Sequence, residues 1–571
     1  MVDFRKALLL LVVLVFATGI ASAQQALNCT LNGAAPPLLR AEGVAEELGQ
    51  AFITCTGGTR TPIGQPVPRI NVRLFTNGYN ITSRLFAFGG GGATASEATL
   101  LIDDPAPLAQ NLASFPTPPT CNGPYSGATC GNMFFAHQVA GNTQAVEWRD
   151  IPFDPPETPG VTRTLRFVNI RVNPALVTGG NVTSLIPPVV QIYVAVTGTF
   201  SLPLQVPFLS VGYVQNGLAF SLRNSGNTAS INSVTLSQCV TPGDPVFHAR
   251  FAELFPNSFR IRGVPGPQNV LTQIYNTESM FFGPAFGVNP AGQATQATRL
   301  RLAFSGIPSG VLLHVPQTVT IGALSATLVA VGTDGNTADP SVPLSGLSLP
   351  AGSVRVVLTG GAGAAVYEVT SAASGSSENL DVPVYVRYSG LPALGSGNVL
   401  GSYAPLSTTD VASSSAPVPR FIQNPAATFP ITVAACETRL LFPFVTSIPG
   451  WDTGIAISNT SADPFGTSAQ SGTCTLNFYG TPGNSTQTSA AIGAGSQLVF
   501  SMSTGNAAQN ISALTGFTGY LIARCNFQYA HGYAFISDIG VRTYAQGYVA
   551  LVIGGGLTSR YSTNAAEALG Q

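Results

Sequence analysis

Charged residues are scarce in this sequence. Asp, Glu, Lys and Arg make up 9% of its 571 residues, whereas a typical soluble protein has roughly 25%. With 24 basic against 25 acidic residues, no basic face is available to neutralise phosphates, so nucleic acid is not a predicted partner. Uncharged polar residues must cover the surface instead, and copies of the chain then repel one another little.

Lysine and long apolar runs are missing after the first residues. Lys6 is the only lysine, and it lies in a predicted export signal over residues 1–23. That signal consists of a basic start, an apolar run over 7–17 and the small residues 21–23 as a cleavage pattern. The run is too short for a comfortable membrane span. The mature chain therefore cannot use a Schiff-base lysine or form a Lys–Asn isopeptide bond. It is expected to have no integral membrane span and to be secreted or held on a bacterial cell surface.

Motifs of known catalytic chemistry are absent, including G-x-S-x-G and H-E-x-x-H. One candidate set remains, in which His531 is a base, Asp538 orients it and Ser458 is the nucleophile. Alternatively, His531 shares the strand parity of Cys525 and Phe527 and is a strand histidine whose ring is satisfied by the backbone. The second interpretation is favoured, so the chain is predicted not to be an enzyme.

A calcium site and glycosylation sites are further alternatives. Asp103 and Asp104 precede a proline and could offer carboxylates to calcium, but such a pair is more typical of a turn. We therefore predict neither a metal nor a cofactor. Six N-x-S/T sequons could carry glycans in a eukaryote, at Asn28, Asn80, Asn181, Asn459, Asn484 and Asn510.

Apolar residues alternate with polar ones in short runs bounded by Gly and Pro. Clear examples are 70–75, 191–197 and 381–387, and period-two alternation indicates half-buried strands. The best helical candidate is 39–50, the most charged stretch, but Gly43 interrupts it. The chain is therefore predicted to be all-β, as tandem immunoglobulin-like or other β-sandwich domains.

Two local patterns refine this prediction. Within 164–173 the apolar parity switches, which predicts a β-bulge at Val168 and Asn169. In 441–461 a Pro-Gly turn containing Trp451 and Asp452 separates two strand-like runs, which predicts a hairpin in which Asp452 caps the turn. Polar, small-residue stretches then suggest the boundaries of a signal over 1–23, an N-terminal β region over 24–230, a central β region over 231–425, a C-terminal sandwich over 426–552 and a tail over 553–571.

Eight cysteines in an exported chain favour disulfides over metal sites. Cys474 and Cys525 each share strand parity with apolar neighbours, so both are expected to face the core and pair, as cysteines do in immunoglobulin-like sandwiches. The other predicted pairs are Cys29–Cys55, Cys121–Cys130 and, by default, Cys239–Cys436.

Several segments resemble a family of long exported multi-domain β-sandwich proteins of acidobacteria-like environmental bacteria. The resemblance is carried by 436–467, 472–480 and 519–540, and by the earlier segments 40–58 and 274–282. It spans most of the chain and implies a bacterial, extracytoplasmic protein. The family supplies no established activity and no catalytic residues.

These observations leave two function classes. The first is a structural subunit of an extracellular filament, pilus-like fibre or surface layer, a homopolymer held by β-strand addition and apolar contacts. The second is a secreted adhesin or carbohydrate-binding protein, with glycans as partners. The sparse charge, the cysteines and the predicted strands favour the first, although an adhesin would share them all.

Overall fold

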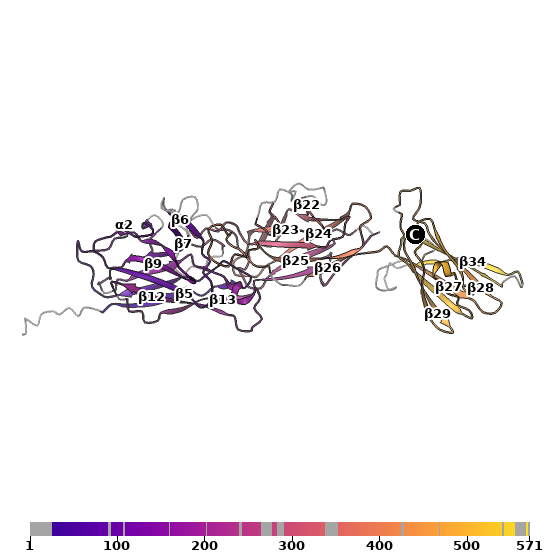
Figure 1. Cartoon of the computed structure of the whole chain (residues 1–571), viewed down its shortest axis with the longest axis horizontal. Helices are drawn as coiled ribbons and strands as arrows, with labels where there is room; N and C mark the ends of the chain where they lie inside the picture. Colours follow the sequence, from indigo (N-terminus) through magenta and orange to yellow (C-terminus); the bar gives the residue numbers. More distant parts are fainter. Residues whose placement is uncertain are drawn as a thin grey trace, which may run out of the picture.

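The computed structural model describes residues 26–571 except 89–92, 107–108, 159, 201, 239–241, 264–276, 282–290, 337–351, 424–427, 468, 539–541, 554–566 and 569–571. Strands dominate these residues, which confirms the all-β prediction. Helices among them are limited to α2 (Gly127–Cys130), α3 (Pro174–Thr178) and the 3-10 helix η2 (Ala507–Gln509). None of these described helices is long and apolar enough to cross a membrane. Figure 1 shows three groups of strands that follow one another in sequence order.

The first group is a sheet that folds over one core extending from Cys29 to Val214. The rings of Trp148 and Phe167 lie on distant strands of this sheet, yet their centroids are 5.1 Å apart across the core. In order, its strands are β1 (Asn28–Gly33), β4 (Ala51–Thr56), β10 (Arg163–Val168), β7 (Ala93–Ile102), β8 (Met133–Val139), β9 (Asn142–Pro152), β5 (Arg69–Thr76), β12 (Val189–Gly198), β13 (Phe208–Gln215) and β2 (Leu38–Arg40), while β6 (Leu85–Phe88) pairs with β7. A separate small sheet pairs β3 (Glu46–Glu47) with β11 (Arg171–Val172).

The second group is a two-layer sandwich whose core extends from Leu218 to Val433. One layer is β15 (Ser230–Ile231), β14 (Leu218–Arg223), β17 (Phe247–Glu253), β24 (Asn379–Tyr388), β19 (Val311–Pro316) and β22 (Ser353–Arg355). The other is β16 (Val234–Ser237), β26 (Phe429–Ala434), β25 (Gly395–Ala404), β18 (Arg299–Ser305), β23 (Gly363–Ser371), β21 (Leu324–Leu328) and β20 (Thr318–Ile321). Strands alone do not assign domain limits, so the boundaries at 230 and 425 stay predictions.

The third group is a second sandwich, here called the C-terminal sandwich, with a core from Leu440 to Val552. Its larger sheet is β30 (Ser485–Thr488), β29 (Cys474–Thr481), β32 (Thr518–Cys525), β27 (Thr438–Thr446), β35 (Leu551–Ile553) and β36 (Glu567–Ala568). Its smaller sheet is β31 (Gln497–Ser501), β28 (Asp452–Asn459), β33 (Ala530–Ser537) and β34 (Ala545–Val549).

The predicted hairpin over 441–461 is wrong. β27 pairs with β32 and β35, whereas β28 pairs with β31 and β33, so the turn carries the chain from one sheet to the other. Asp452 does cap this region, because its carboxylate accepts hydrogen bonds from the backbone N–H groups of Thr453 and Ser503 at 2.9 and 3.0 Å. Alternation within each strand could not reveal which sheet the next strand would join.

The predicted bulge at Val168 and Asn169 is also wrong. β10 ends at Val168, and Asn169 takes a left-handed conformation with φ of 59°. The chain then enters β11, which pairs with β3 in a different sheet. The parity switch therefore marks a change of sheet rather than an extra residue in one strand.

Three of the predicted disulfides are present among the described residues: Cys29–Cys55, Cys121–Cys130 and Cys474–Cys525. Cys474 and Cys525 are fully buried and directly opposite each other on β29 and β32, which confirms the inward-facing parity. Their bond lies within one sheet, whereas the immunoglobulin-type bridge joins two sheets. Cys239 lies outside the described residues, so its pairing with Cys436 stays a prediction.

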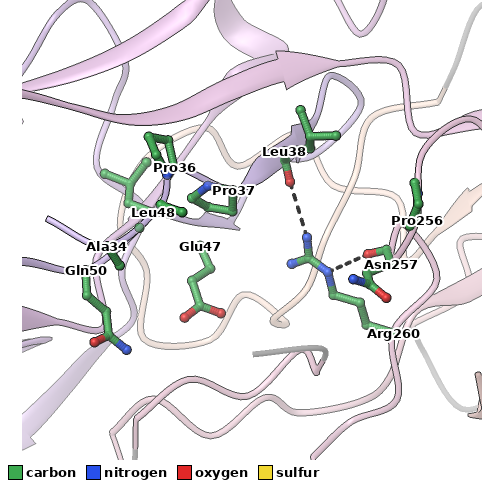
Figure 2. Close-up of a pocket in the computed structure, with 12 residues that line it drawn as sticks. Ala34, Pro36, Pro37, Leu38, Glu47, Leu48, Gln50, Pro256, Asn257 and Arg260 are labelled. Atoms are coloured by element: carbon green, nitrogen blue, oxygen red, sulfur yellow. Dashed lines mark hydrogen bonds between the residues drawn. The ribbon is translucent and has the colours of Figure 1, made fainter. Parts of the chain in front are cut away.

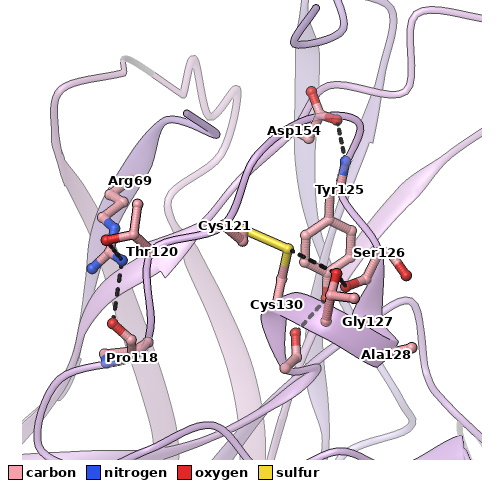
Figure 3. Close-up of a disulfide and its surroundings, with 12 residues drawn as sticks. Arg69, Pro118, Thr120, Cys121, Tyr125, Ser126, Gly127, Ala128, Cys130 and Asp154 are labelled. Carbon is pink, nitrogen blue, oxygen red and sulfur yellow. Dashed lines mark hydrogen bonds between the residues drawn. A yellow bond between two sulfur atoms is a disulfide. The ribbon is translucent and has the colours of Figure 1, made fainter. Parts of the chain in front are cut away.

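The disulfide with the smallest sequence separation among those described, Cys121–Cys130, closes a loop at one end of the first core (Figure 3). Cys121 and Cys130 bracket it, and α2 forms its second half. Inside the loop the Tyr125 hydroxyl donates to the Gly131 carbonyl at 2.8 Å, and the Tyr125 backbone N–H donates to Asp154 at 2.9 Å. The disulfide and these hydrogen bonds together hold a segment that has little regular structure.

Candidate functional site

The structure does not assemble the candidate catalytic set. Ser458 and His531 are register partners on β28 and β33, but Asp538 lies just beyond the far end of β33. Asp538 follows His531 by seven positions, so in an extended strand their Cα atoms lie about 23 Å apart. His531 is a strand residue, as the favoured interpretation predicts, but its side chain is exposed. Tyr529 takes a left-handed conformation, which ends the parity expected from Cys525.

The two aspartates considered for calcium are used in ion pairs. Asp103 pairs with Arg163 at 3.2 Å, and Asp104 pairs with Arg166. Each carboxylate therefore has a guanidinium partner. Within the described ranges no cluster of three or more His, Cys, Asp or Glu residues has metal-binding geometry.

The smaller sheet of the C-terminal sandwich exposes an uncharged apolar surface, here called the aromatic face (Val499, Tyr533, Phe535 and Val549). Each of these side chains is between 45% and 48% exposed. Register places them in adjacent rows on one side of the sheet: Val499, Ala456, Tyr533 and Val549 in one row, and Ser501, Gly454, Phe535 and Gly547 in the next. A third row holds Gln497, Ser458 and His531. These three described rows contain no Asp, Glu, Lys or Arg. The next row, on the side of Phe535, holds Ser537 and Asp452, whose carboxylate accepts the hydrogen bonds from Thr453 and Ser503.

The rings on this face lie over very small neighbours. Phe535 has Gly454 and Gly547 as its register partners. A Cβ atom at Gly547 would overlap the hydroxyl and ring of Tyr533, so that ring lies across β34. Glycine at this position therefore permits a flat aromatic surface. Contiguous exposed apolar patches of this kind mark interaction sites on soluble proteins.

A groove of about 570 Å³ opens between the two sheets, beside the aromatic face. It lies next to β34, the edge strand of the smaller sheet. Its lining is mostly apolar or hydroxyl-bearing: Phe444, Thr446, Ile448, Trp451, Thr518, Ile536, Tyr544, Ala545 and Gln546. The Pro-Gly turn noted in the sequence therefore contributes Trp451 to a groove wall.

A second feature is a cluster of buried charged residues in this charge-poor chain. It lies where segments of the first group of strands contact segments of the second. We call this the junction cluster (Arg40, Glu42, Glu46, Glu47, Arg171, Arg260 and Glu278). All seven side chains belong to residues at most 8% exposed. Arg40 donates to Glu278 through both terminal nitrogens at 2.8 and 3.0 Å, and to Glu46 through Nε at 2.9 Å. The Arg40 guanidinium also lies 4.7 Å from the ring centroid of Phe421.

Acidic groups outnumber arginines in this cluster, and burial favours the protonated form of two of them. Burial raises the pKa of Glu42 to about 7 and that of Glu47 to about 8. Glu42 still accepts hydrogen bonds from the backbone N–H groups of Gly217 and Leu218 at 3.0 and 3.3 Å. The sequence marked 39–50 as its most charged stretch but gave no sign that these charges are buried.

These raised pKa values predict that the first two cores lose stability as pH rises. The folded chain binds more protons than the unfolded chain, whose glutamates have a pKa of about 4.3, so stability falls until pH passes the folded pKa values. Each pKa unit corresponds to about 1.4 kcal/mol, so we expect a loss of about 2 kcal/mol between pH 7 and pH 9. Burial lowers the pKa of His137 and of His314, so both are neutral in this range.

Urea denaturation of a Trp451→Phe variant would measure this loss, because buried Trp148 then reports on the first core alone. Glu47→Gln should remove most of the slope between pH 7 and pH 9. A wild-type midpoint that stays constant over this range would contradict the burial of protonated glutamates.

Comparisons with known proteins add little to this description. No protein-family model matches the sequence, and no curated protein matches it. The serine-rich repeat adhesion glycoprotein Srr1 of Streptococcus agalactiae aligns with 58% of this chain and 95% of its own, at 8% identity and a TM-score of 0.14. A mutant of the CFA/I enterotoxigenic E. coli adhesin CfaE aligns with 65% of this chain and 93% of its own, at 10% identity and a TM-score of 0.13. At these TM-scores neither alignment bears on fold or activity.

Proposed function

We propose that this protein is an extracellular adhesin-type protein that binds neutral polysaccharide through the aromatic face of the C-terminal sandwich. The observation that carries this proposal is the apolar surface around Tyr533 and Phe535, whose three rows hold no Asp, Glu, Lys or Arg. Sugar rings present apolar C–H faces that pack on aromatic rings, and their hydroxyl groups need uncharged hydrogen-bonding partners at the edges. Gln497, Ser458 and His531 supply such partners in the adjacent row. Disulfides in the first core and in the C-terminal sandwich suit an oxidising, extracytoplasmic compartment.

The test is to replace both rings, as Tyr533→Ala with Phe535→Ala. We expect binding to insoluble cellulose or chitin, or to soluble dextran or xylan, to fall at least about tenfold, because two ring contacts of about 1 kcal/mol each are lost. Pull-down and affinity electrophoresis measure this loss.

A matched control is available on the opposite sheet. Tyr479 and Tyr520 form a stacked pair with ring centroids 5.2 Å apart, and they are 37% and 40% exposed. Replacing both with alanine should leave polysaccharide binding unchanged. The proposal fails if the wild-type chain binds none of the four polymers, or if the control variant loses binding equally.

A second candidate, a subunit of a filament or surface layer, is favoured by the groove beside edge strand β34. An added strand from another copy would pair with this edge and place apolar side chains in the groove. The N-terminal segment is a poor donor, because β1 pairs with β4 and Cys29 is bonded to Cys55. Electron microscopy of the purified chain distinguishes the candidates: filaments would favour this second one, and monomers at high concentration would remove its support.

A further inference from the structure

A pocket of about 290 Å³ lies next to the junction cluster (Figure 2). It is formed by residues 34–38 and 47–50 of the first group and by residues 256–260 of the second. Pro36, Pro37 and Leu48 supply apolar walls, and Glu47, Gln50 and Arg260 supply polar groups. We call this cavity the junction pocket.

Two polar side chains that line this pocket offer groups without a partner among the described residues. Glu47 is 8% exposed, and among the described residues its carboxyl group forms no hydrogen bond or ion pair. Gln50 is 5% exposed, and in the part of the chain that the structure describes its Nε2 has no hydrogen-bond acceptor, although its Oε1 accepts from Arg166 at 2.7 and 3.1 Å. Buried polar groups are normally satisfied, so the orphaned Gln50 amide, beside a Glu47 carboxyl group that lines the same cavity, points to a ligand.

The surrounding charges narrow the class of ligand. The positive guanidinium groups of Arg171 and Arg260 interact electrostatically with Glu47, and their charge would repel a cation in the pocket. The carboxylates of Glu46 and Glu278 also interact electrostatically with Glu47, and their charge would repel an anion. Arg260 is itself held by the carbonyls of Leu38 and Asn257, at 3.4 and 2.9 Å, so the polar wall is already fixed (Figure 2).

A hydroxyl group meets these requirements. It can accept a hydrogen bond from Gln50 Nε2 and donate one to Glu47, and it carries no charge. We propose that the junction pocket binds a small neutral hydroxylated ligand, a single sugar ring or a polyol, through Glu47 and Gln50. The volume is at the low end of the range for small-molecule sites, which suits one ring and not an oligomer. The pocket shares no residue with the aromatic face, so this proposal and the proposed function succeed or fail separately.

The experiment uses the full chain with glucose, galactose, mannose and glycerol as probes, followed by saturation-transfer NMR and calorimetry. For a ligand of about twelve heavy atoms we expect a dissociation constant of about 1 mM. Glu47→Leu should weaken binding at least about tenfold, since it removes a group worth about 1.4 kcal/mol. Glu47→Gln keeps a donor and an acceptor of the same shape and should stay within about threefold of the wild-type affinity.

Two further measurements test whether the small probes bind in the junction pocket. The paired alanine variant of Tyr533 and Phe535 should leave binding of the small probes unchanged, which shows that they occupy the junction pocket. The proposal is overturned if no probe binds the wild-type chain at concentrations well above 1 mM, or if Glu47→Leu folds and binds as well as the wild type. It is also overturned if calcium chloride or sodium phosphate, but no sugar or polyol, gives a Glu47-dependent signal.

Discussion

Replacing Arg40 with leucine is expected to lower the free energy of unfolding of the first two cores by about 3–5 kcal/mol. The side chains of Arg40, Glu46 and Glu278 are all fully buried, and Arg40 pairs with both acids. Removing the guanidinium leaves Glu46 and Glu278 buried without their cationic partner. The free-energy cost of these two uncompensated charges exceeds the gain from no longer burying the charge of Arg40. Arg40 also donates to the Ser258 carbonyl at 3.0 Å, so a backbone group loses its donor as well.

Arg524→Leu is the matched control, because 54% of the arginine side chain is accessible in its pair with Glu437, and Glu437 keeps Arg439 as a second partner. An exposed pair of this kind contributes less than about 1 kcal/mol. Urea unfolding followed through Trp148 reports the Arg40 variant, and unfolding followed through Trp451 reports the control. Adding Glu278→Leu to Arg40→Leu should recover part of the loss. If Arg40→Leu lowers the free energy of unfolding by less than about 1 kcal/mol, the junction cluster does not stabilise the contact between the two cores.

Removing the disulfide between Cys474 and Cys525 is expected to destabilise the C-terminal sandwich by about 4 kcal/mol, because the bond closes a loop with a sequence separation of 51 residues. Alanine at both positions is the appropriate change, since both side chains are fully buried and serine would bury unpaired hydroxyls. Urea unfolding followed through Trp451 in a Trp148→Phe background measures the loss.

The short loop closed by Cys121 and Cys130 provides the comparison. Its sequence separation is only 9 residues, so the same chain-entropy estimate gives about 2.6 kcal/mol, and that loss should fall on the first core. Peptide mapping without reduction that found Cys474 as a free thiol would contradict the structure directly. Equal unfolding midpoints for the wild-type chain and its Cys474→Ala, Cys525→Ala variant would contradict the stabilising role.

Much of the fold could be predicted from local patterns. In 381–387, Val382, Val384 and Val386 are all fully buried, as period-two alternation indicates. The disulfide partners Cys474 and Cys525 were predictable for the same reason, since parity placed both toward a core. Which sheet receives each strand depends on contacts distant in sequence, so the passage from β27 to β28 could not be predicted.

The aromatic face and the junction cluster were harder to predict than the strands. Tyr533 and Phe535 lie on a strand for which alternation from Cys525 predicts the wrong parity, because nothing in the sequence marks the left-handed Tyr529 between β32 and β33 as a break. The charged residues of 39–50 are buried because segments more than 200 residues away in the sequence pack against them and supply Glu278 and Arg260. No local signal pairs Arg40 with Glu278. A charged run in a charge-poor chain was nevertheless an indication that this segment has a special role.

The disulfide between Cys29 and Cys55 has a mechanical consequence. These residues are register partners at one end of β1 and β4, and β1 is an edge strand at the N-terminal end of the first sheet. A force that pulls on the chain before Asn28 would peel an unbonded edge strand away one hydrogen bond at a time. Here the tension passes at Cys29 through the sulfur bridge into β4, which is held by a neighbour on each side. Residues 30–33 are therefore shielded from this tension while the bridge is intact, so the force does not peel β1 from β4.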